Sequence, residues 1–431
     1  MKFWRLLYQI GLNVSALILP VVALFSKRVR RWWKHARPIP PVPPEGKPVL
    51  WMHCASAGEF EQGRVVLEFL LRQLPVRPFF VLTFFSPSGW ERYQHNYSYA
   101  DWVGPAPMDF PWLIRRWVHT LQPVAVFFVK YDLWPNLLHI LRQMGIPTYL
   151  LSAHIVPLQG LRWWWKKQLL PYLQWIFVQT QEDGQRLTHI GVTQFSVAGD
   201  TRLLRVMEIA KQPKSFPDIE RWIGGRFCVV AGSLWPADVD FLAEAYGMLR
   251  GYETYWLLVP HHVSEEMIVY IHRKWPVRCV QYSQDYQGVR RNTLIIDTMG
   301  ILAYLYAYAD VVWIGGGFGK GIHNILEAII YKKPVFFGPN YQSFPEAHEM
   351  IKRGVAESCR YPVSFANAVK SLHKDRRRAQ VIFSKVDSYL SAQGDILHII
   401  WDKLQREEWV QRLKRQAVSL NDSPEPSTLT F

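Results

Sequence analysis

The chain has 431 residues, of which 49% are apolar and 20% are charged. This length suits two domains of about 150–200 residues, and the composition excludes a wholly disordered chain. Lys and Arg outnumber Asp and Glu by 50 to 35, which gives a net charge of +15 and favours a polyanionic partner: a nucleic acid, an anionic membrane or a phosphorylated substrate. Four scattered cysteines without a CxxC pair argue against a disulfide scaffold and a zinc ribbon.

The first 37 residues are predicted to attach the chain to a membrane. Residues 6–25 form a mostly apolar stretch of 20 residues, about the length that crosses a hydrocarbon core. Six basic residues follow between positions 27 and 37, and the positive-inside rule places them in the cytoplasm. Polar interruptions leave an in-plane amphipathic helix open as an alternative. A cleaved signal peptide is disfavoured because no small-x-small site follows the apolar run.

After a Pro-rich spacer at residues 38–48, short apolar strands alternate with helical periods. This rhythm predicts parallel sheets covered by helices on both faces. The first strands are expected at residues 49–53, 79–83, 124–129, 148–152, 175–179 and 195–198. The second series is expected at residues 227–231, 255–259, 277–281, 293–296, 311–314 and 334–337.

The predicted fold class is therefore α/β, with two doubly wound, Rossmann-like units facing a cleft. The first domain is expected at residues 49–210 and the second at residues 226–390, joined by a linker at 211–225. A single charged helix at residues 391–417 and a flexible tail at 418–431 are expected to close the chain.

Three segments that follow predicted strands carry unusual residues, and open α/β sheets bind ligands beyond the carboxyl ends of their strands. In the first, His53-Cys-Ala-Ser-Ala-Gly-Glu59, small residues form a tight turn and Glu59 opens the next helix. A helix N-terminus keeps such a carboxylate ionised and fit to act as a base. The alternative is a helix-capping acid, since glutamate is common in a first turn.

The second segment is a glycine loop, residues 315–321, with five glycines in seven positions before a helix. This composition is typical of a phosphate cradle, although it matches neither the Walker A nor the GxGxxG spacing. Asn324 and Glu327 follow on one helix face, where Glu327 can bind a ribose diol. In the third segment, Gly232-Ser233 can bind the same phosphate. A flexible glycine turn and a plain strand-to-helix turn remain alternatives.

No metal and no cofactor are expected. The sequence contains no HExxH motif and no Cys/His cluster, and the adjacent His261-His262 pair cannot easily face one metal. Asp238 and Asp240 lie two apart early in a predicted helix, so they point to different sides. We expect this pair to be solvated acids rather than a metal clamp.

In their order along the chain, the motifs resemble those of the lipid A Kdo transferases, also called 3-deoxy-D-manno-octulosonic acid transferases. The resemblance covers residues 49–352 and the N-terminal anchor. Besides the segments above, it rests on Leu82-Thr-Phe-Phe-Ser-Pro-Ser-Gly89, Asp132-Leu-Trp-Pro-Asn136, Gly199-Asp-Thr-Arg202, Asp297-Thr-Met-Gly300, His323-Asn-Ile-Leu-Glu327 and Phe337-Gly-Pro339. It implies a GT-B fold, with the acceptor bound mainly by the first domain and the nucleotide by the second.

The resemblance also implies an activity. It implies metal-independent, inverting transfer of Kdo from CMP-Kdo to a lipid A precursor in lipopolysaccharide core biosynthesis, at the cytoplasmic face of the inner membrane. Glu59 corresponds to the catalytic base of the family, and Arg202 is expected near the leaving phosphate or the sugar carboxylate. Where the family often has two carboxylates, this chain has Lys130 and Asp132. Acceptor-side candidates are Ser56, Ser86, Ser88 and Gly89.

For the donor site, the usual Pro-Arg-His of the family is Pro260-His261-His262 here. A phosphate-binding arginine is therefore missing, and His261 or Lys320 is expected to replace it. The other expected donor-binding residues are Ser233, Pro260, Gly300, Ile301, Leu302, Gly316, Gly317, His323, Asn324, Ile325, Leu326 and Glu327.

Two other functions remain open on the sequence. One is a different GT-B glycosyltransferase that uses a UDP-sugar to build a membrane glycolipid, which the glycine loop serves equally well. The other is a non-enzymatic, basic, membrane-bound binding module, which explains the charge but not two phosphate-binding turns. Because no RNP or zinc-finger pattern is present, the expected partners are the lipid A precursor, CMP-Kdo and inner-membrane lipids, and not nucleic acid.

Overall fold

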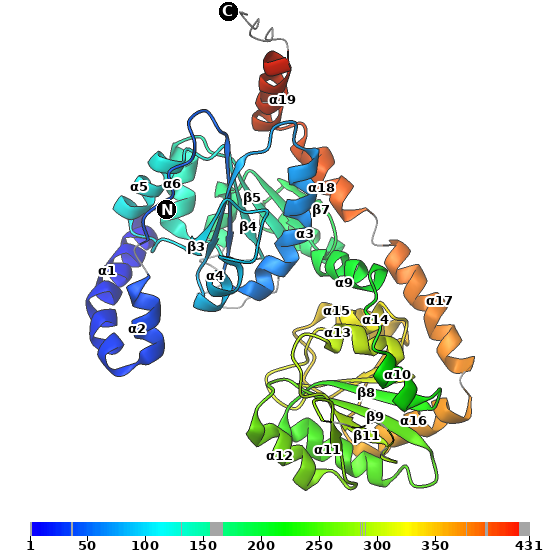
Figure 1. Cartoon of the computed structure of the whole chain (residues 1–431). Helices are drawn as coiled ribbons and strands as arrows, with labels where there is room; N and C mark the ends of the chain where they lie inside the picture. The colour runs from blue at the N-terminus through cyan, green and yellow to red at the C-terminus, as the bar shows by residue number, and fades with distance from the viewer. Residues whose placement is uncertain are drawn as a thin grey trace, which may run out of the picture. The chain divides into compact units, whose positions relative to one another are not determined.

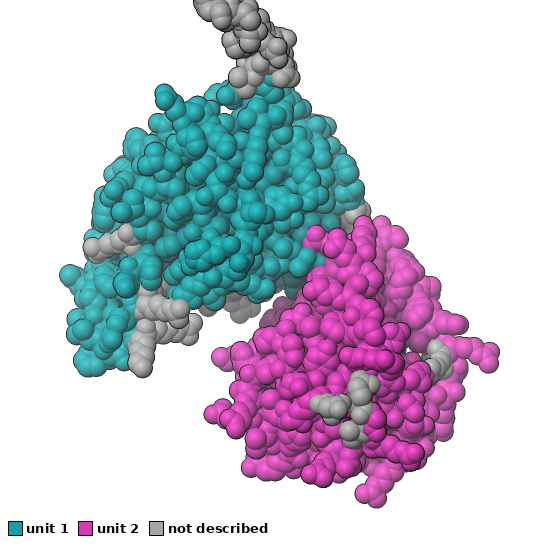
Figure 2. Space-filling model, in the orientation of Figure 1, with its two compact units in different colours: residues 1–205, 394–431 teal, residues 206–393 magenta. Residues whose placement is uncertain are grey.

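The computed structural model describes residues 2–35, 38–130, 132–155, 167–284, 286, 288, 290–375, 377–392 and 395–421. The chain divides into two compact units (Figures 1 and 2): unit 1 comprises residues 1–205 and 394–431, and unit 2 comprises residues 206–393. Each unit holds one seven-stranded sheet whose neighbouring strands are all parallel. The predicted α/β class with two Rossmann-like units is confirmed.

The sheet of unit 1 has the strand order β3-β2-β1-β4-β5-β6-β7. Its strands are β1 (Val49–Cys54), β2 (Phe79–Phe84), β3 (Trp102–Pro105), β4 (Ala125–Val129), β5 (Thr148–Ala153), β6 (Trp175–Val178) and β7 (Phe195–Val197). Alternate residues of β1 face opposite cores, so Leu50 and Met52 pack on one side and Trp51 on the other. One side is covered by α3 (Ala57–Gln73), α18 (Ile396–Leu404) and α19 (Glu408–Asn421), and the other by α5 (Pro111–Leu121), α6 (Pro135–Gln143) and α8 (Gln181–His189).

The sheet of unit 2 has the order β10-β11-β9-β8-β12-β13-β14, which differs from that of unit 1 because β11 lies between β10 and β9. Its strands are β8 (Phe227–Leu234), β9 (Thr254–Pro260), β10 (Val280–Gln281), β11 (Thr293–Ile295), β12 (Val311–Ile314), β13 (Val335–Phe337) and β14 (Ala356–Ser358). The helices of one face are α11 (Pro236–Gly247), α12 (Glu265–Lys274) and α16 (Pro362–Lys374). The other helices of the unit include α13 (Leu302–Leu305), α14 (Leu326–Ile329), α15 (Pro345–Lys352) and α17 (Arg377–Ala392).

In each sheet the first strand lies between the second and the later strands, so the winding reverses beside it. The switch points are therefore β1/β4 in unit 1 and β8/β12 in unit 2. Doubly wound sheets bind their ligands at the carboxyl ends of the strands at such a point.

The prediction of one helix at residues 391–417 is wrong. The chain forms α18 and α19 instead, and both belong to unit 1. The cause is a change of phase: Ile396, Ile400 and Leu404 are spaced by four, whereas the next core residues are Trp409 and Val410. A break between the helices lets both stripes face the same core. Of the predicted tail, residues 418–421 are helical, and residues 422–431 lie outside the described part.

The predicted linker at residues 211–225 is also largely structured. It contains α10 (Pro217–Ile223), which follows α9 (Thr201–Lys211). Pro217 opens α10, acidic residues stand in its first turn, and Ile219 and Trp222 are buried. Proline at the first helical position and acids near a helix N-terminus are favourable, so this short segment forms a helix.

The N-terminal helix α1 (Lys2–Phe25) is long and apolar enough over Arg5–Phe25 to cross a membrane. One side of α1 packs on unit 1: the hydroxyl of Tyr8 donates to Asp109 at 2.9 Å, and the amide of Asn136 donates to Gln9 at 3.2 Å. The opposite side exposes leucine, isoleucine and valine side chains. Basic residues follow in α2 (Lys27–Lys34). Whether α1 spans the bilayer or lies in its plane stays a prediction, but it is not separate from the globular unit.

Candidate active site

The carboxyl ends of β1 and β4 meet at the switch point of unit 1. After β1 the chain turns through Ala55 and Ser56 into α3, and after β4 it continues through Lys130. Nε2 of His53, near the end of β1, lies 2.9 Å from Oδ2 of Asp132. This contact joins segments that are 79 residues apart in the sequence.

Glu59 is the third residue of α3, and its Oε2 accepts the backbone N–H of Ala55 at 2.7 Å. Burial raises the pKa of the Glu59 carboxyl, and the Ala55 hydrogen bond opposes this shift. Among the nearby charges, Asp132 raises the pKa of Glu59 further, whereas Lys130 and His53 lower it. The expected hydrogen bond at the start of the helix is present, and burial makes the carboxylate more basic, whereas the role of Glu59 as a base stays a prediction.

His53 is a residue that the sequence analysis quoted without giving it a role. Its side chain is 1% exposed, and both ring nitrogens have partners. Nδ1 lies 3.1 Å from the hydroxyl of Thr83, and Nε1 of Trp134 donates to Nε2 at 3.0 Å. A buried ring with contacts at both nitrogens cannot move freely, and its Nε2 lies close to both the indole of Trp134 and the carboxylate of Asp132. Its place before the strand-to-helix turn was the only signal in the sequence.

Lys130 adopts φ of 64°, and Ser233 in unit 2 adopts φ of 55°. Both residues are beside a switch point, at the ends of β4 and β8. Non-glycine residues in this left-handed region cost about 1–3 kcal/mol, and such strain is concentrated at functional sites.

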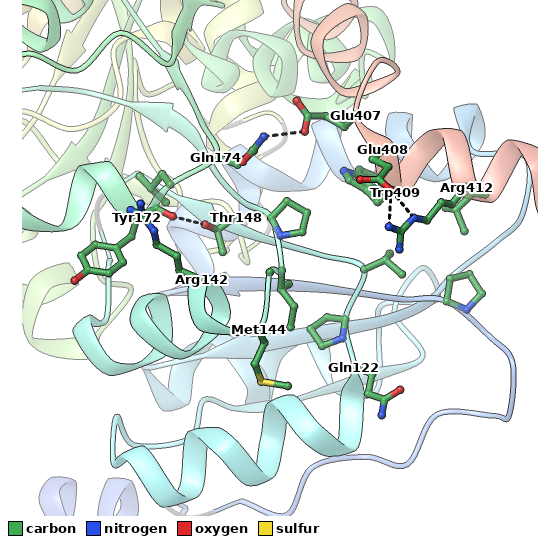
Figure 3. A pocket seen from close by; sticks show the side chains of 18 of the residues that line it. Gln122, Arg142, Met144, Thr148, Tyr172, Gln174, Glu407, Glu408, Trp409 and Arg412 are labelled. Atoms are coloured by element: carbon green, nitrogen blue, oxygen red, sulfur yellow. Dashed lines mark hydrogen bonds and ion pairs between the residues drawn. The ribbon is translucent and has the colours of Figure 1, made fainter.

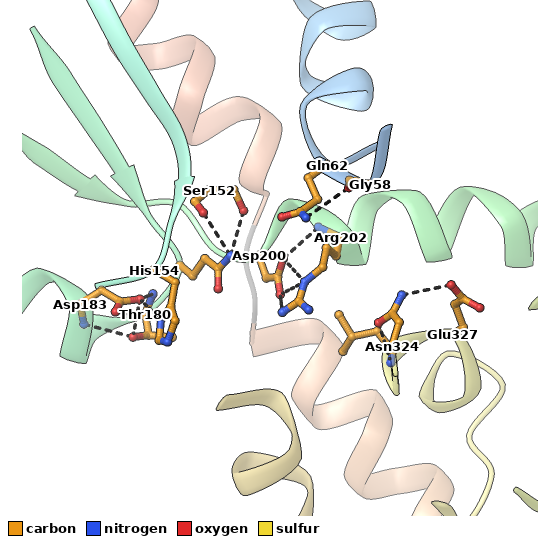
Figure 4. Close-up of polar contacts among 12 residues, drawn as sticks. Gly58, Gln62, Ser152, His154, Thr180, Asp183, Asp200, Arg202, Asn324 and Glu327 are labelled. Atoms are coloured by element: carbon orange, nitrogen blue, oxygen red, sulfur yellow. Dashed lines mark hydrogen bonds and ion pairs between the residues drawn. The ribbon is translucent and has the colours of Figure 1, made fainter. Parts of the chain in front are cut away.

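Arg202 begins α9, and its guanidinium forms an ion pair with Asp200 at 2.6 Å (Figure 4). The same helix is tied to α3 because Nε of Arg205 lies 3.2 Å from Glu61. Arg202 therefore belongs to a helix that contacts the helix of Glu59, but its guanidinium is paired with the carboxylate of Asp200.

The acceptor-side candidates follow β1 and β2, which are neighbouring strands. Ser56 is the N-cap residue of α3, and the hydroxyls of Ser86 and Ser88 lie 2.9 Å apart at the start of α4 (Pro87–Tyr93). Gly89 has a packing reason, since a Cβ there would lie 2.3 Å from the ring of Phe84.

A groove of about 840 Å³ in unit 1 lies at the opposite edge of the sheet (Figure 3). Its lining includes Pro48, Val124 and Thr148, which stand at the amino ends of β1, β4 and β5. Beside it the carboxylate of Glu407 accepts the hydroxyl of Tyr149 at 2.9 Å. Residues of the C-terminal segment line this groove, which lies away from the candidate catalytic residues.

In unit 2, the glycine loop runs close to neighbouring strand ends. A Cβ on Gly315 would lie 2.2 Å from the carbonyl oxygen of Ser233, and one on Gly317 would lie 2.6 Å from the backbone of Gly338. Gly316 has φ of 92°. Close backbone approach and a positive φ therefore require these three glycines. The glycine density thus has a structural cause besides the predicted phosphate cradle.

The expectation that Asp238 is a solvated acid is wrong. Its carboxylate is 1% exposed and accepts the backbone N–H groups of Gly316 at 2.9 Å and Trp235 at 3.0 Å. Burial raises its pKa, and these hydrogen bonds oppose the shift. Asp240 points elsewhere, as expected, and forms an ion pair with Lys274 at 3.5 Å. Asp238 instead holds the glycine loop against β8.

The remaining donor-site candidates are gathered near this switch point. Nδ2 of Asn324 donates to Oε1 of Glu327 at 3.2 Å (Figure 4), so the pair shares a face as expected. A Cβ on Gly232 would lie 2.9 Å from Leu302, which places the segment of Gly300, Ile301 and Leu302 beside Gly232 and Ser233. Ile325 and Leu326 are buried, and Lys320 is exposed in the loop. Pro260 ends β9, and His261 and His323 stack on each other at 4.1 Å.

Among the residues that the structure describes, no group of three His, Cys, Asp or Glu side chains is arranged to hold a metal ion. Independence from metal stays a prediction.

Comparisons with known proteins find the same family in a family model and in curated relatives. The family model described as 3-Deoxy-D-manno-octulosonic-acid transferase (kdotransferase) matches residues 27–205. A 3-deoxy-D-manno-octulosonic acid transferase of Chlamydia muridarum is 25% identical over 85% of this chain and 88% of its own length. The enzyme of the same name from Aquifex aeolicus is 26% identical over 71% of this chain and 80% of its own length.

Solved structures show the fold alone. A UDP-GlcNAc 2-epimerase from Neisseria meningitidis matches with a TM-score of 0.61 at 13% identity, over 83% of this chain and 100% of that chain. The expected GT-B class is confirmed by this likeness and by the two sheets. The family model and the curated relatives thus support the placement of the chain in the 3-deoxy-D-manno-octulosonic acid (Kdo) transferase family of glycosyltransferases.

Proposed function

We propose that the protein transfers Kdo from CMP-Kdo to a lipid A precursor, with inversion at the anomeric carbon and without a metal. The observation that carries this proposal is Glu59. It is a partly buried carboxylate of raised pKa, held by Ala55 at the start of α3 beside Asp132 and Lys130.

In the proposed reaction, a hydroxyl of the acceptor loses its proton to Glu59 as its oxygen attacks the anomeric carbon of Kdo. The bond from that carbon to the phosphate oxygen breaks, and CMP leaves with the electron pair. The hydrogen bond from Ala55 to Oε2 orients the carboxylate, and general-base catalysis of this kind contributes about 10²–10⁴-fold.

Unit 2 would hold the donor. The N–H groups and hydroxyl of the Gly232-Ser233 turn, together with the glycine loop, are the groups that stabilise the charge developing on the leaving phosphate. Glu327, fixed by Asn324 at 3.2 Å, would accept hydrogen bonds from the ribose. Arg202 and Lys320 are the proposed cations for the phosphate and the carboxylate of Kdo.

Kdo transferases are associated with membranes, and we propose the inner membrane, with both units on its cytoplasmic side. The exposed apolar side of α1 and the basic α2 support this placement, because apolar side chains enter the bilayer and lysines and arginines stay in the cytoplasm. The lipid acceptor would then reach the protein from the same surface.

The test is incubation of the purified full chain with CMP-Kdo and a tetra-acylated lipid A precursor, followed by mass spectrometry of the lipid. A Kdo-bearing product with release of CMP, unchanged by EDTA, is the expected result. A parallel reaction with UDP-sugars addresses the alternative glycosyltransferase. Product from a UDP-sugar but not from CMP-Kdo would overturn the proposal.

A further inference from the structure

Three imidazoles and one indole stack at the ends of three neighbouring strands of unit 2. Trp235 follows β8, His261 and His262 follow β9, and His323 follows β12 and the glycine loop. The rings of His261 and His323 lie 4.1 Å apart at 22°, and those of His261 and Trp235 lie 4.9 Å apart at 24°. The ring of His262 stands edge-on at 4.4 Å from His261. We call these four residues the histidine stack.

One hydrogen bond sets the protonation of His323 within the stack. Nε1 of Trp235 donates to Nε2 of His323 at 2.9 Å. An indole nitrogen can only donate, so Nε2 of His323 carries no proton and the ring is neutral with its hydrogen on Nδ1. The contact is accessible to solvent and solutes, since Trp235 is 40% exposed.

The surroundings of His261 and His323 favour the neutral forms of these two rings. Burial and the neighbouring rings of His261 and His262 lower the pKa of His323 to about 4. Burial and His262 also lower the pKa of His261. Asp238 of α11 bonds to the backbone of Gly316 and Trp235 instead of to an imidazole, and Lys320 stands three residues before His323. Within the described residues, no carboxylate forms an ion pair with these rings.

The stack borders the place where a ligand anion is expected. A Cβ on Gly316 would lie 3.1 Å from Cδ2 of His323, so the ring rests on the glycine loop. The β8/β12 switch point, where doubly wound sheets bind ligands, is at the same edge. A bound anion favours the protonated imidazole, whereas the surroundings of His261 and His323 favour neutral rings when no anion is bound.

We propose that the histidine stack is a proton-linked anion site, which takes up about one proton from solvent when it binds the phosphate of the donor. This inference rests on the proposed CMP-sugar donor. A phosphodiester carries one permanent negative charge, and one imidazolium balances it. Without a ligand, the neutral rings avoid repulsion among adjacent cations, which fixed arginines at these positions would suffer.

The measurable consequence is an affinity that depends on pH. Binding linked to the uptake of one proton strengthens about tenfold for each unit by which the pH falls. The uptake is complete only below the pKa of the ligand-bound stack, so we expect a gain of about tenfold between about pH 7.5 and about pH 6.0.

Calorimetry on the full chain, at constant ionic strength and in buffers of different ionisation enthalpy, tests this with two probes. Cytidine 5′-methylphosphate is a phosphodiester that does not titrate in this range, and sulfate is an anion without a nucleoside. We expect both to bind more tightly at low pH and to take up protons. In the double variant His261→Gln, His323→Gln, which keeps an acceptor for Trp235 but cannot be protonated, the gain should fall below about twofold. The control His272→Gln, an exposed histidine of α12, should behave as the wild type.

The outcomes separate the two proposals. Cytidine binding that ignores pH, without proton uptake, overturns the histidine stack as a proton-linked site and leaves the donor assignment standing. Sulfate binding linked to protons, without cytidine binding, supports the stack and contradicts the CMP donor. If neither probe binds, both proposals fail. If the double variant does not fold, His261→Arg, which places a permanent cation in the stack, should make sulfate binding insensitive to pH, and an unchanged pH dependence would overturn the proposal.

Discussion

Both sheets are parallel and have a switch point beside their first strand, but the two switch points differ in chemistry. In unit 1 the strand ends carry polar side chains with fixed partners: the carboxylate of Glu59 accepts the backbone N–H of Ala55, and His53 contacts Asp132. In unit 2 the strand ends are built from backbone, with glycines packed against backbone atoms and neutral imidazoles stacked beside them. A fixed carboxylate of raised pKa suits the removal of a proton, and an uncharged pocket of N–H groups suits an anion. Each switch point therefore suits the part of the proposed reaction that we assign to its unit.

The largest expected effect is that of Glu59→Gln, which should lower turnover through unit 1 without changing the binding of CMP to unit 2. Glutamine can still accept the N–H of Ala55 but cannot take up a proton. Turnover should fall about 10²–10⁴-fold, while binding of CMP stays near that of the wild type. Steady-state kinetics and calorimetry measure the two quantities.

The matched control for this variant is Glu182→Gln, which alters a first-turn glutamate of α8 in the same unit. It should keep full activity. If Glu59→Gln also retained most of its turnover, Glu59 would be a cap alone and Asp132 would be the next candidate for the base.

The variant Glu327→Ala in unit 2 is expected to act on the binding of CMP, which Glu59→Gln should leave unchanged. Loss of charge-assisted hydrogen bonds to the ribose, worth about 1.5–3 kcal/mol, should weaken CMP binding about 10–100-fold. The thermal unfolding temperature should change little, since Glu327 is partly exposed. Unchanged CMP affinity would place the nucleotide elsewhere.

A pair of glycine substitutions sharpens the contrast between backbone and side chain. Gly317→Ala puts a Cβ 2.6 Å from the backbone of Gly338, and we expect a loss of about 1–3 kcal/mol in the free energy of unfolding. Gly58→Ala, in the turn of Glu59, meets only the hydroxyl of Ser56 at 3.9 Å. Alanine favours the helix by about 0.5–1 kcal/mol there, so this variant should be neutral or more stable. Equal effects of the two in urea unfolding would contradict the contrast.

The smallest predicted effect is a shift of pH dependence by Asp132→Asn. The charge of Asp132 raises the pKa of Glu59, so its removal lowers that pKa. A base with a lower pKa stays ionised in more acidic solution, and the acid limb of the kcat/KM profile should move to lower pH. A limb that stays in place, or that moves to higher pH, would show that Asp132 does not act on Glu59.

Much of this architecture could be predicted from local patterns, because buried parallel strands are continuous apolar runs. The strands β3 and β14 were not predicted, because Trp102-Val-Gly-Pro105 contains two strand-breaking residues and Ala356-Glu-Ser358 has no apolar run. Glu59 could be found because the turn and the helix start are adjacent in the sequence. The contacts of Asp238 with Gly316 and of Trp235 with His323 span 78 and 88 residues. The periodicity of the sequence does not encode such long-range contacts. For this reason Asp238 was wrongly expected to be solvated, and the histidine stack was not predicted.

The docking of α1 has a consequence for the order of events during synthesis. Tyr8 bonds to Asp109, which is 101 residues away, and Gln9 bonds to Asn136, which is 127 residues away. At about 5–20 residues per second, the ribosome makes Asp109 about 5–20 s after Tyr8. During that interval the partners of α1 in unit 1 are not yet made, so its exposed apolar side chains are available to a bilayer. With the membrane placement that we propose, the nascent chain would reach the bilayer before unit 1 folds, and unit 1 would then assemble against a helix that is already in place.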